Sequence, residues 1–253
     1  MGPRQRAASG GFRHRAASAG FPLAYALSSA VASAAGAFGT RRAAALTKPI
    51  PLALLAGRAL LRRQHHYSGL GIDDALLAGA IAFSAAGDRA MLLEEFTPTD
   101  TEADRVTKDR RLATGAALFG VAQLCYSTLF WRRGARPTVQ AFAPRMAALG
   151  ESAAVLAANR PRPLLVLSPY GTSLAAMSTL AGAVDSPQPS ARIGGLLFLA
   201  SDFTILNRRH LISGATARSI SEVWVLASYF AAQYLLTDAV DVAASPDAAG
   251  ELA

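Results

Sequence analysis

Two aspartates, Asp88 and Asp202, lie inside long apolar stretches of the chain. An ionised carboxylate at the centre of a bilayer costs about 2.5–3.5 kcal/mol on insertion scales, so such residues usually face a protein interior or a wet cavity. A carboxyl group in a low-dielectric site can hold its proton near neutral pH and donate it. A second, ionised carboxylate can stabilise a cation and orient water. The pair is therefore suited to acid–base catalysis without a metal or an organic cofactor.

The two aspartates have similar surroundings in the sequence. Each follows a small residue, and each segment has a glycine four positions before a phenylalanine, Gly79 and Gly194 respectively. Small residues allow helices to approach closely, so we expect both aspartates at tight helix contacts in the interior. In the alternative interpretation, Asp88 only pairs with a cation or caps a helix, and Asp202 lies at the membrane interface.

Several polar side chains near the aspartates are candidates for binding a substrate. Gln123 and Tyr126 are spaced to share one helix face, and so are Tyr229 and Gln233. The predicted substrate-binding residues are Lys48, Ser84, Gln123, Tyr126, Tyr170, Tyr229 and Gln233. The tyrosines could instead belong to an interfacial belt, and the lysine could extend its ammonium to the membrane surface.

Apolar segments that could position these residues recur along the whole chain, separated by short breaks that carry arginine. Hydrophobic residues make up 52% of the chain and charged residues only 17%, against roughly 25% in soluble domains. A backbone exposed to lipid must satisfy its own hydrogen bonds, so we expect helices. The sequence predicts an all-α fold, a polytopic transmembrane helix bundle of about eight spans. The spans are expected at 21–38, 46–61, 75–93, 112–131, 139–158, 164–184, 193–206 and 220–237.

The distribution of charged residues limits the kinds of partner that the chain is expected to bind. The net charge is +8, but the arginines form short clusters between apolar runs rather than one basic face, so we expect lipid head groups and no nucleic acid as partners. The single cysteine, Cys125, excludes an intrachain disulfide and a cysteine-based metal cluster. Motifs typical of zinc hydrolases, P-loop proteins and serine hydrolases are absent from the sequence.

We divide the chain into a basic N-terminal segment at 1–19, a helix bundle at 20–238 and a disordered C-terminal tail at 239–253. The first apolar stretch could be a signal peptide, but its length favours a retained span. The most polar break, 97–111, is expected to be a loop. Lysine and arginine counts are balanced between the two sides, so only the basic N-terminus favours cytoplasmic termini in the cell membrane.

Four sequence elements, in order along the chain, resemble those of one known family. They are Lys48-Pro49, Phe83-Ser-Ala-Ala-Gly-Asp88, Gly194-x-x-x-Phe-x-x-Ser-Asp202 and Tyr229-Phe-Ala-Ala-Gln233. With this set the chain resembles the YhhN family, multi-pass helical membrane proteins that include the lysoplasmalogenases. The family often has a His-x-x-Tyr arrangement where this chain has Gln123 and Tyr126. Since glutamine does not transfer protons near neutral pH, no acid–base role is expected at Gln123.

The resemblance implies hydrolysis of the vinyl ether bond of lysoplasmalogens, alkenyl glycerophosphocholine or glycerophosphoethanolamine. The products would be a fatty aldehyde and a glycerophospho-base. Asp88 and Asp202 would be the catalytic pair, with Asp202 as the acid because fewer charges flank it. Lys48 or a loop arginine would hold the substrate phosphate. The alternatives are a proton-coupled lipid or small-molecule carrier and a non-catalytic membrane protein whose aspartates only hold helices together.

Overall fold

The computed structural model describes residues 3–64, 71–159, 162, 164–185, 189–211 and 214–242. Only the backbone is described for 3–19, 152, 155, 156, 159, 206–211, 241 and 242. The described residues form nine α-helices and no strand, which confirms the all-α prediction. The helices are α1 (Pro3–Phe38), α2 (Arg41–Thr47), α3 (Pro49–Gln64), α4 (Ile72–Glu95), α5 (Glu102–Arg132), α6 (Val139–Asn159), α7 (Leu164–Gly182), α8 (Ser190–Leu211) and α9 (Ala215–Val242).

Six helical segments of the described chain are long and apolar enough to cross a membrane, so the protein is a multi-pass membrane protein. They are 20–38, 41–64, 72–95, 102–132, 164–182 and 215–240. The prediction of about eight spans is therefore met only in part. The other two predicted spans correspond to α6, which contains Pro144, Arg145 and Glu151, and α8, whose side chains are described only to Ile205.

Two predicted boundaries are wrong. The second span begins at Arg41, because α2 continues into α3 across Lys48, whose helical backbone donates to the carbonyl of Ala44. Proline at the first position of α3 needs no hydrogen-bond acceptor there. The break at 97–111 is mostly helix, because Thr101 and Asp104 form a capping box that starts α5 at Glu102.

The C-terminal helix also extends beyond its predicted end. Helix α9 reaches Val242, so the first residues of the segment expected to be disordered are helical. Residues 243–253 lie outside the described part of the chain.

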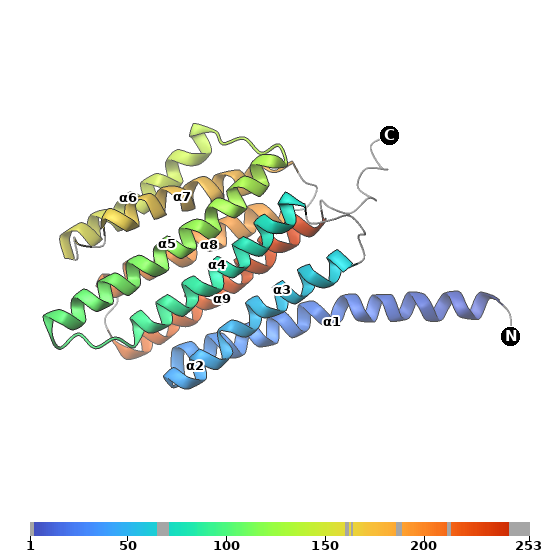
Figure 1. Ribbon diagram of the computed structural model, residues 1–253, viewed down its shortest axis with the longest axis horizontal. Coiled ribbons are helices and arrows are strands. Elements are labelled where there is room, and N and C mark those ends of the chain that lie inside the picture. The colour runs from blue at the N-terminus through green and yellow to red at the C-terminus, as the bar shows by residue number, and fades with distance from the viewer. Residues whose placement is uncertain are drawn as a thin grey trace.

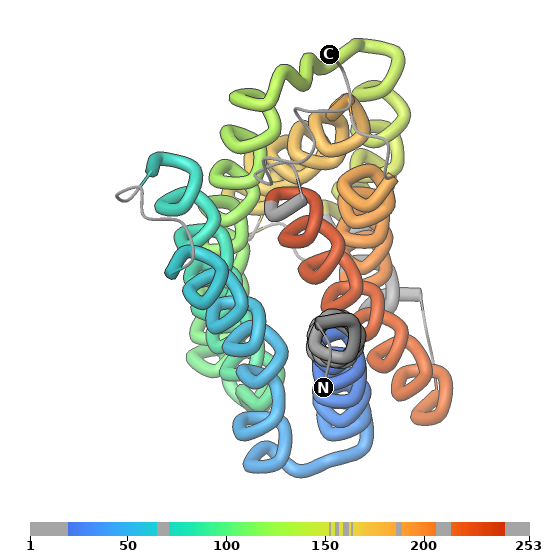
Figure 2. The backbone as a smooth tube through the Cα atoms, turned by 90° about the vertical axis from the view of Figure 1, so that its right-hand side faces the viewer, coloured from blue at the N-terminus to red at the C-terminus, as the bar shows by residue number. Residues whose placement is uncertain are grey.

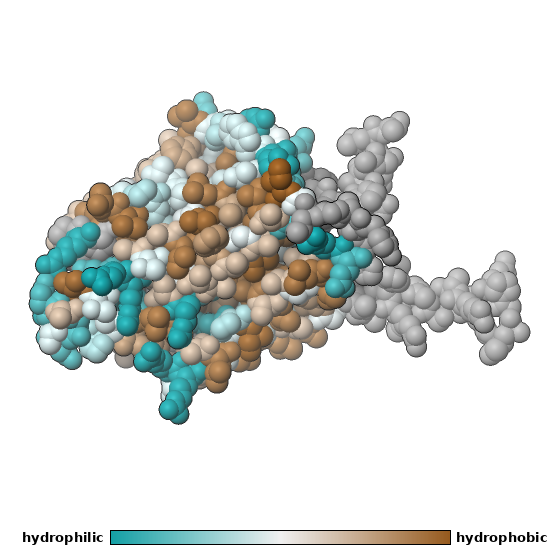
Figure 3. All heavy atoms as spheres, viewed as in Figure 1, coloured by the Kyte–Doolittle hydropathy of each residue, from teal (hydrophilic) through white to brown (hydrophobic). Residues whose placement is uncertain are grey.

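The helices form an elongated bundle in which chain order and spatial order differ (Figure 1). Helix α4 packs along α5, α8 packs along α9, and α7 lies between α5 and α8. Helix α9 also contacts α1 and α3, so it lies between the N-terminal helices and α8 (Figure 2). Apolar side chains cover the middle of the visible face, and hydrophilic ones gather at the end that contains α2 and the α4–α5 connection (Figure 3).

Small residues bring the helices together near both aspartates. A Cβ atom on Gly87 would lie 2.8 Å from the ring of Phe119, so α4 approaches α5 directly beside Asp88. On α8, Ser201 precedes Asp202 and donates from its Oγ to the carbonyl of Val225 on α9 at 3.0 Å. The small residues before both aspartates therefore lie at helix contacts, as their sequence settings predict.

Candidate active site

A cavity of about 90 Å³ lies between the helices toward the end of the bundle that contains the α4–α5 connection. Both aspartates line it. Asp88 is seven residues, about 10 Å along the axis, before the end of α4, and Asp202 is about 13 Å before the end of α8. A cavity of this size has room for water molecules. Its polar lining residues are Lys48, Asp88, Glu95, Tyr170, Ser201, Asp202, Glu222 and Tyr229.

Each aspartate accepts a hydrogen bond from a tyrosine on another helix. Tyr229 on α9 donates its hydroxyl to Oδ2 of Asp88 at 2.9 Å. Tyr170 on α7 donates to Oδ2 of Asp202, which is only 8% exposed. A hydroxyl that donates to one carboxyl oxygen restricts the rotation of that group, so these contacts fix the orientation of both carboxyl groups. The cavity thus has two acids that are held in the same way on opposite helices.

Aromatic rings form one wall of the cavity between the helices. Phe119, Phe198 and Tyr229 line it and pack edge to face, with ring centroids 5.7 to 6.3 Å apart. Leu112 and Leu167 add aliphatic surface. The cavity therefore combines an apolar lining with a few polar groups, which is typical of a ligand site.

One buried cation shares the cavity with the acids. Lys48 is 7% exposed, and its Nζ lies 3.6 Å from Oε2 of Glu95 and 4.0 Å from Oε1 of Glu222. These separations exceed the 2.7–3.2 Å range of an N–H···O hydrogen bond. Among the described residues that line the cavity, four are carboxylic acids and only Lys48 is a cation.

The model of the YhhN family matches residues 43–240, which run from within α2 to within α9 and include every residue of the cavity lining described above. The chain belongs to the YhhN family. No curated protein matches it, and neither does any solved structure.

The predicted site residues of this YhhN protein divide into two groups. Five of them line the cavity together: Lys48, Asp88, Tyr170, Asp202 and Tyr229. The remaining four, Ser84, Gln123, Tyr126 and Gln233, lie outside the cavity lining and are fully buried between helices. Their assignment to substrate binding stays a prediction.

Three residues of the second group, Ser84, Tyr126 and Gln233, form a buried hydrogen-bonded layer. Gln233 donates from Nε2 to Oγ of Ser84 at 2.9 Å and accepts from the Tyr126 hydroxyl at 2.9 Å. The Thr237 hydroxyl lies 3.4 Å from the same Tyr126 oxygen. These side chains join α4 and α5 to α9. Gln123, at the position of the family histidine, accepts from Ser173 on α7.

Two lining acids of the YhhN site, Glu95 and Glu222, were not predicted from the sequence. Both lie near helix ends, where charged residues are ordinary in a membrane protein. Their spacing from predicted site residues could have indicated them, because Glu95 follows Asp88 by seven residues and Glu222 precedes Tyr229 by seven. Two helical turns separate the members of each pair and place them on one face.

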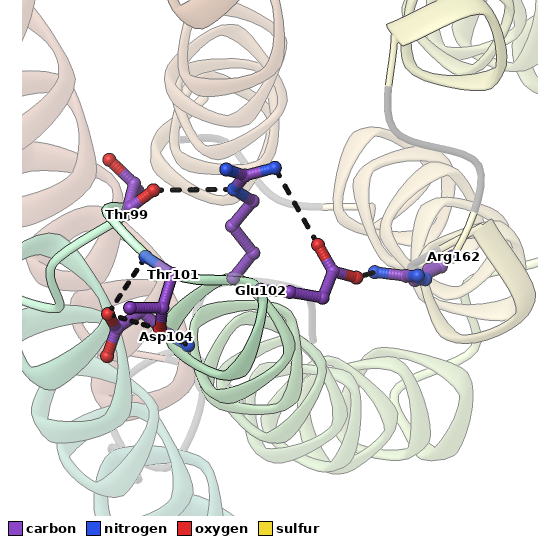
Figure 4. A network of polar contacts seen from close by, with 6 residues as sticks. Thr99, Thr101, Glu102, Asp104 and Arg162 are labelled. Carbon is purple, nitrogen blue, oxygen red and sulfur yellow. Dashed lines mark hydrogen bonds and ion pairs between the residues drawn. The ribbon is translucent and has the colours of Figure 1, made fainter.

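At the same end of the bundle, polar contacts on the surface link the α4–α5 connection to the segment before α7 (Figure 4). Glu102, at the start of α5, accepts from Arg162, which precedes α7, at 2.6 Å, and also pairs with Arg105 at 3.7 Å. Arg105 donates to the carbonyl of Thr99 at 3.3 Å. The hydrogen bond and charge of Glu102 raise the pKa of Arg162, so that side chain stays charged. The network lies outside the cavity lining.

Proposed function

We propose that this YhhN protein is a lysoplasmalogenase-like hydrolase of the cell membrane, with a lysophospholipid as substrate. The observation that supports this best is the cavity itself, because Asp88 and Asp202 reach it from different helices and each is oriented by a tyrosine. Two carboxyl groups at one site can divide the roles of acid and anion, as they do in glycosidases.

In the proposed reaction, the Asp202 carboxyl group protonates the alkene carbon farther from the ether oxygen. This leaves an oxocarbenium ion, which the ionised Asp88 stabilises. Water then adds to the cationic carbon and gives up a proton to a carboxylate, forming a hemiacetal. The hemiacetal releases a fatty aldehyde and the glycerophospho-base as its carbon–oxygen bond to glycerol breaks. One water is consumed, and the proton used in the first step is returned.

Asp202 is proposed as the acid because it has the less charged surroundings. Both aspartates accept from a tyrosine, but Asp88 lies on the helix face that leads to Glu95 and Lys48. The aromatic wall of Phe119, Phe198 and Tyr229 gives the cation a second source of stabilisation, since ring faces attract positive charge.

The buried layer has an indirect role in this proposal. Ser84 and Tyr126 each hydrogen-bond to Gln233 and thereby link α4 and α5 to α9. They therefore position Tyr229 and, through it, Asp88. Gln123 accepts a hydrogen bond from Ser173 in the middle of α7, three residues after Tyr170.

The test compares three lysophospholipids with one head group and different chain linkages: alkenyl ether, alkyl ether and acyl ester. The purified protein in detergent is expected to release aldehyde from the alkenyl lipid alone, because only that linkage has a carbon that a carboxylic acid can protonate readily. Release of fatty acid from the ester would contradict the proposed chemistry. Proton-coupled lipid uptake into liposomes without aldehyde release would support a carrier, and neither activity would support a non-catalytic role.

A further inference from the structure

Two arginines, Arg145 and Arg192, lie together where three helices meet at the end of the bundle away from the cavity. Helix α7 starts near Glu102 at the α4–α5 end and ends at Gly182 near the opposite end. A Cβ atom on Gly182 would lie 3.5 Å from Nη2 of Arg145, on α6, and 3.8 Å from Cγ of Arg192, in the first turn of α8. Both side chains therefore flank one point between α6, α7 and α8, which pack against one another.

Arg145 is held in place but keeps unused donors. Its Nε donates to Oγ of Ser178 on α7 at 3.0 Å, and its Nη1 donates to the carbonyl of Ala141 in its own helix. A guanidinium has five N–H donors in a rigid plane. Among the described residues, none accepts a hydrogen bond from Nη2, the atom beside Gly182. The two bonds fix the plane of the guanidinium, so Nη2 is available to a ligand at the end of α7.

The two arginines lack acidic partners. Their positive charges oppose each other. In the part of the chain that the structure describes, no ion pair joins either arginine to a carboxylate. Glu151 on α6 and Asp185 in the α7–α8 connection are exposed and pair with neither. Like charges in proximity are unfavourable, and an anion that contacts both guanidinium groups would offset their repulsion.

The start of α8 adds positive potential at the same point. The amide of Ile193 donates to the carbonyl of Pro189 at 2.9 Å, so the amides that precede Ile193 lie at the positive end of the helix. Helix N-termini bind phosphate groups through such amides. Guanidinium groups also match the oxygens of phosphate in geometry. Together these groups favour a phosphate as the anion.

An exposed apolar strip continues from Arg192 along α8. Ile193 and Leu196 are 43% and 41% exposed. Leu196 lies one turn beyond Arg192 on the same helix face, about 6 Å farther into the bundle from this end. Arg145 lies about 9 Å from the start of α6, also near the membrane surface. Positive charge near the surface, followed by exposed apolar side chains, fits a phospholipid better than a free phosphate, which would use only the charges.

We propose that Arg145 and Arg192 form a binding site for the phosphate of an anionic phospholipid. The phosphate lies beside Gly182 between the two guanidinium groups, and an acyl chain lies along Leu196. Two positive charges without a paired carboxylate favour an anionic head group over a zwitterionic one. The site is separate from the cavity, because neither arginine lines it and Arg192 precedes Asp202 by about 15 Å along α8. This lipid is a ligand of the bundle and not its substrate.

Binding of phosphatidylglycerol and phosphatidylcholine to the purified full chain in neutral detergent tests this site. Phosphatidylglycerol is expected to bind more tightly and to raise the unfolding temperature more. Arg145→Gln and Arg192→Gln are each expected to weaken phosphatidylglycerol binding about tenfold, as for loss of one charge-assisted contact, and to leave phosphatidylcholine binding unchanged. Glycerophosphate, which has the phosphate but no acyl chain, is expected to compete only weakly.

Arg132→Gln is the matched control, because Arg132 is an exposed arginine at the same end of the bundle that already pairs with Asp73. It removes the same charge and is expected to change phosphatidylglycerol binding little. Arg192→Gln keeps the test decisive if Arg145→Gln does not fold, since Arg192 is exposed.

Three results would overturn the proposal. The first is equal affinity of wild type for the two lipids, and the second is an equal loss of phosphatidylglycerol binding in Arg192→Gln and Arg132→Gln, including no loss in either. The third is glycerophosphate binding as tight as that of phosphatidylglycerol, which would assign the arginines to a free anion.

Discussion

Arg58 and Lys48 are both buried cations at helix contacts, but their partners differ. Arg58 donates to Asp238 on α9 at 2.5 Å, and its guanidinium lies over the rings of Phe21 and Tyr234, 4.9 Å and 5.5 Å from their centroids. Lys48 keeps 3.6 Å or more from each carboxylate and lines a cavity. Their side chains are 11% and 9% exposed, so burial alone does not distinguish them.

One membrane bundle thus contains polar groups in two different settings. The Arg58 guanidinium forms an ion pair with Asp238 and joins α3 to α9 beside α1. The cavity residues leave donors and acceptors directed toward a space that a ligand can fill. Variants of both regions test whether stability depends on the Arg58–Asp238 ion pair and activity on the cavity.

The largest effect is expected from the cavity acids. Asp88→Asn and Asp202→Asn should each lower kcat for aldehyde release by about 10²–10⁴-fold, the usual contribution of a positioned acid or base. The double variant should lose little more than the worse single variant, because residues that act as a unit are not additive. Steady-state kinetics of the three variants measures this. If the kcat loss of the double variant equalled the product of the two single losses, the aspartates would act independently, which would contradict a shared site.

Arg58→Gln should lower stability rather than activity. Breaking a buried ion pair leaves Asp238 without this cation, at a cost of about 3 kcal/mol. Unfolding in mixed micelles measures the change, with the exposed Arg132→Gln, whose partner is Asp73, as control. Equal stability of the two arginine variants would contradict a structural role of Arg58, and so would a loss of activity in the folded fraction of Arg58→Gln.

Tyr229→Phe and Tyr170→Phe should lower kcat about tenfold each, since each removes one hydrogen bond to a proposed catalytic carboxyl group but keeps the ring. The effect on KM should be small. Tyr25→Phe is a matched control, because Tyr25 also donates to a buried acceptor, the Phe230 carbonyl, outside the cavity. Equal losses in all three variants would argue for a general packing effect.

The smallest effect is expected from the buried layer. Ser84→Ala removes the acceptor for Gln233 Nε2 and should cost about 1 kcal/mol of stability, with kcat reduced no more than a few-fold. Parallel unfolding and kinetic measurements check both values. A loss of activity as large as that of Asp88→Asn would place Ser84 in the reaction itself.

The two acids could be predicted from the sequence because they interrupt apolar runs in small-residue settings. Lipid exposure also requires helix, so the fold class followed from hydropathy. The partners could not be predicted, since Tyr229 and Asp88 are 141 residues apart and helix spacing indicates which residues share a face, not what that face contacts.

The charges near helix ends were harder to interpret. Arg58 and Asp238 meet across 180 residues, and no local pattern relates them. Glu95 and Glu222 resemble ordinary interfacial residues until their seven-residue spacing from Asp88 and Tyr229 is considered. The predicted start of the span at 112 was wrong for a related reason. The capping box at Thr101 extends α5 into a charged segment that hydropathy alone does not assign to a span.

The most direct test makes the same substitution in both regions, comparing Asp202→Asn in the cavity with Asp238→Asn in the ion pair. Aldehyde release per folded molecule and unfolding in mixed micelles are measured on the same preparations. Asp202→Asn is expected to lose nearly all activity and little stability. Asp238→Asn is expected to lose stability but to keep its activity when folded. Full activity in folded Asp202→Asn would contradict the claim that the cavity acids carry out the reaction.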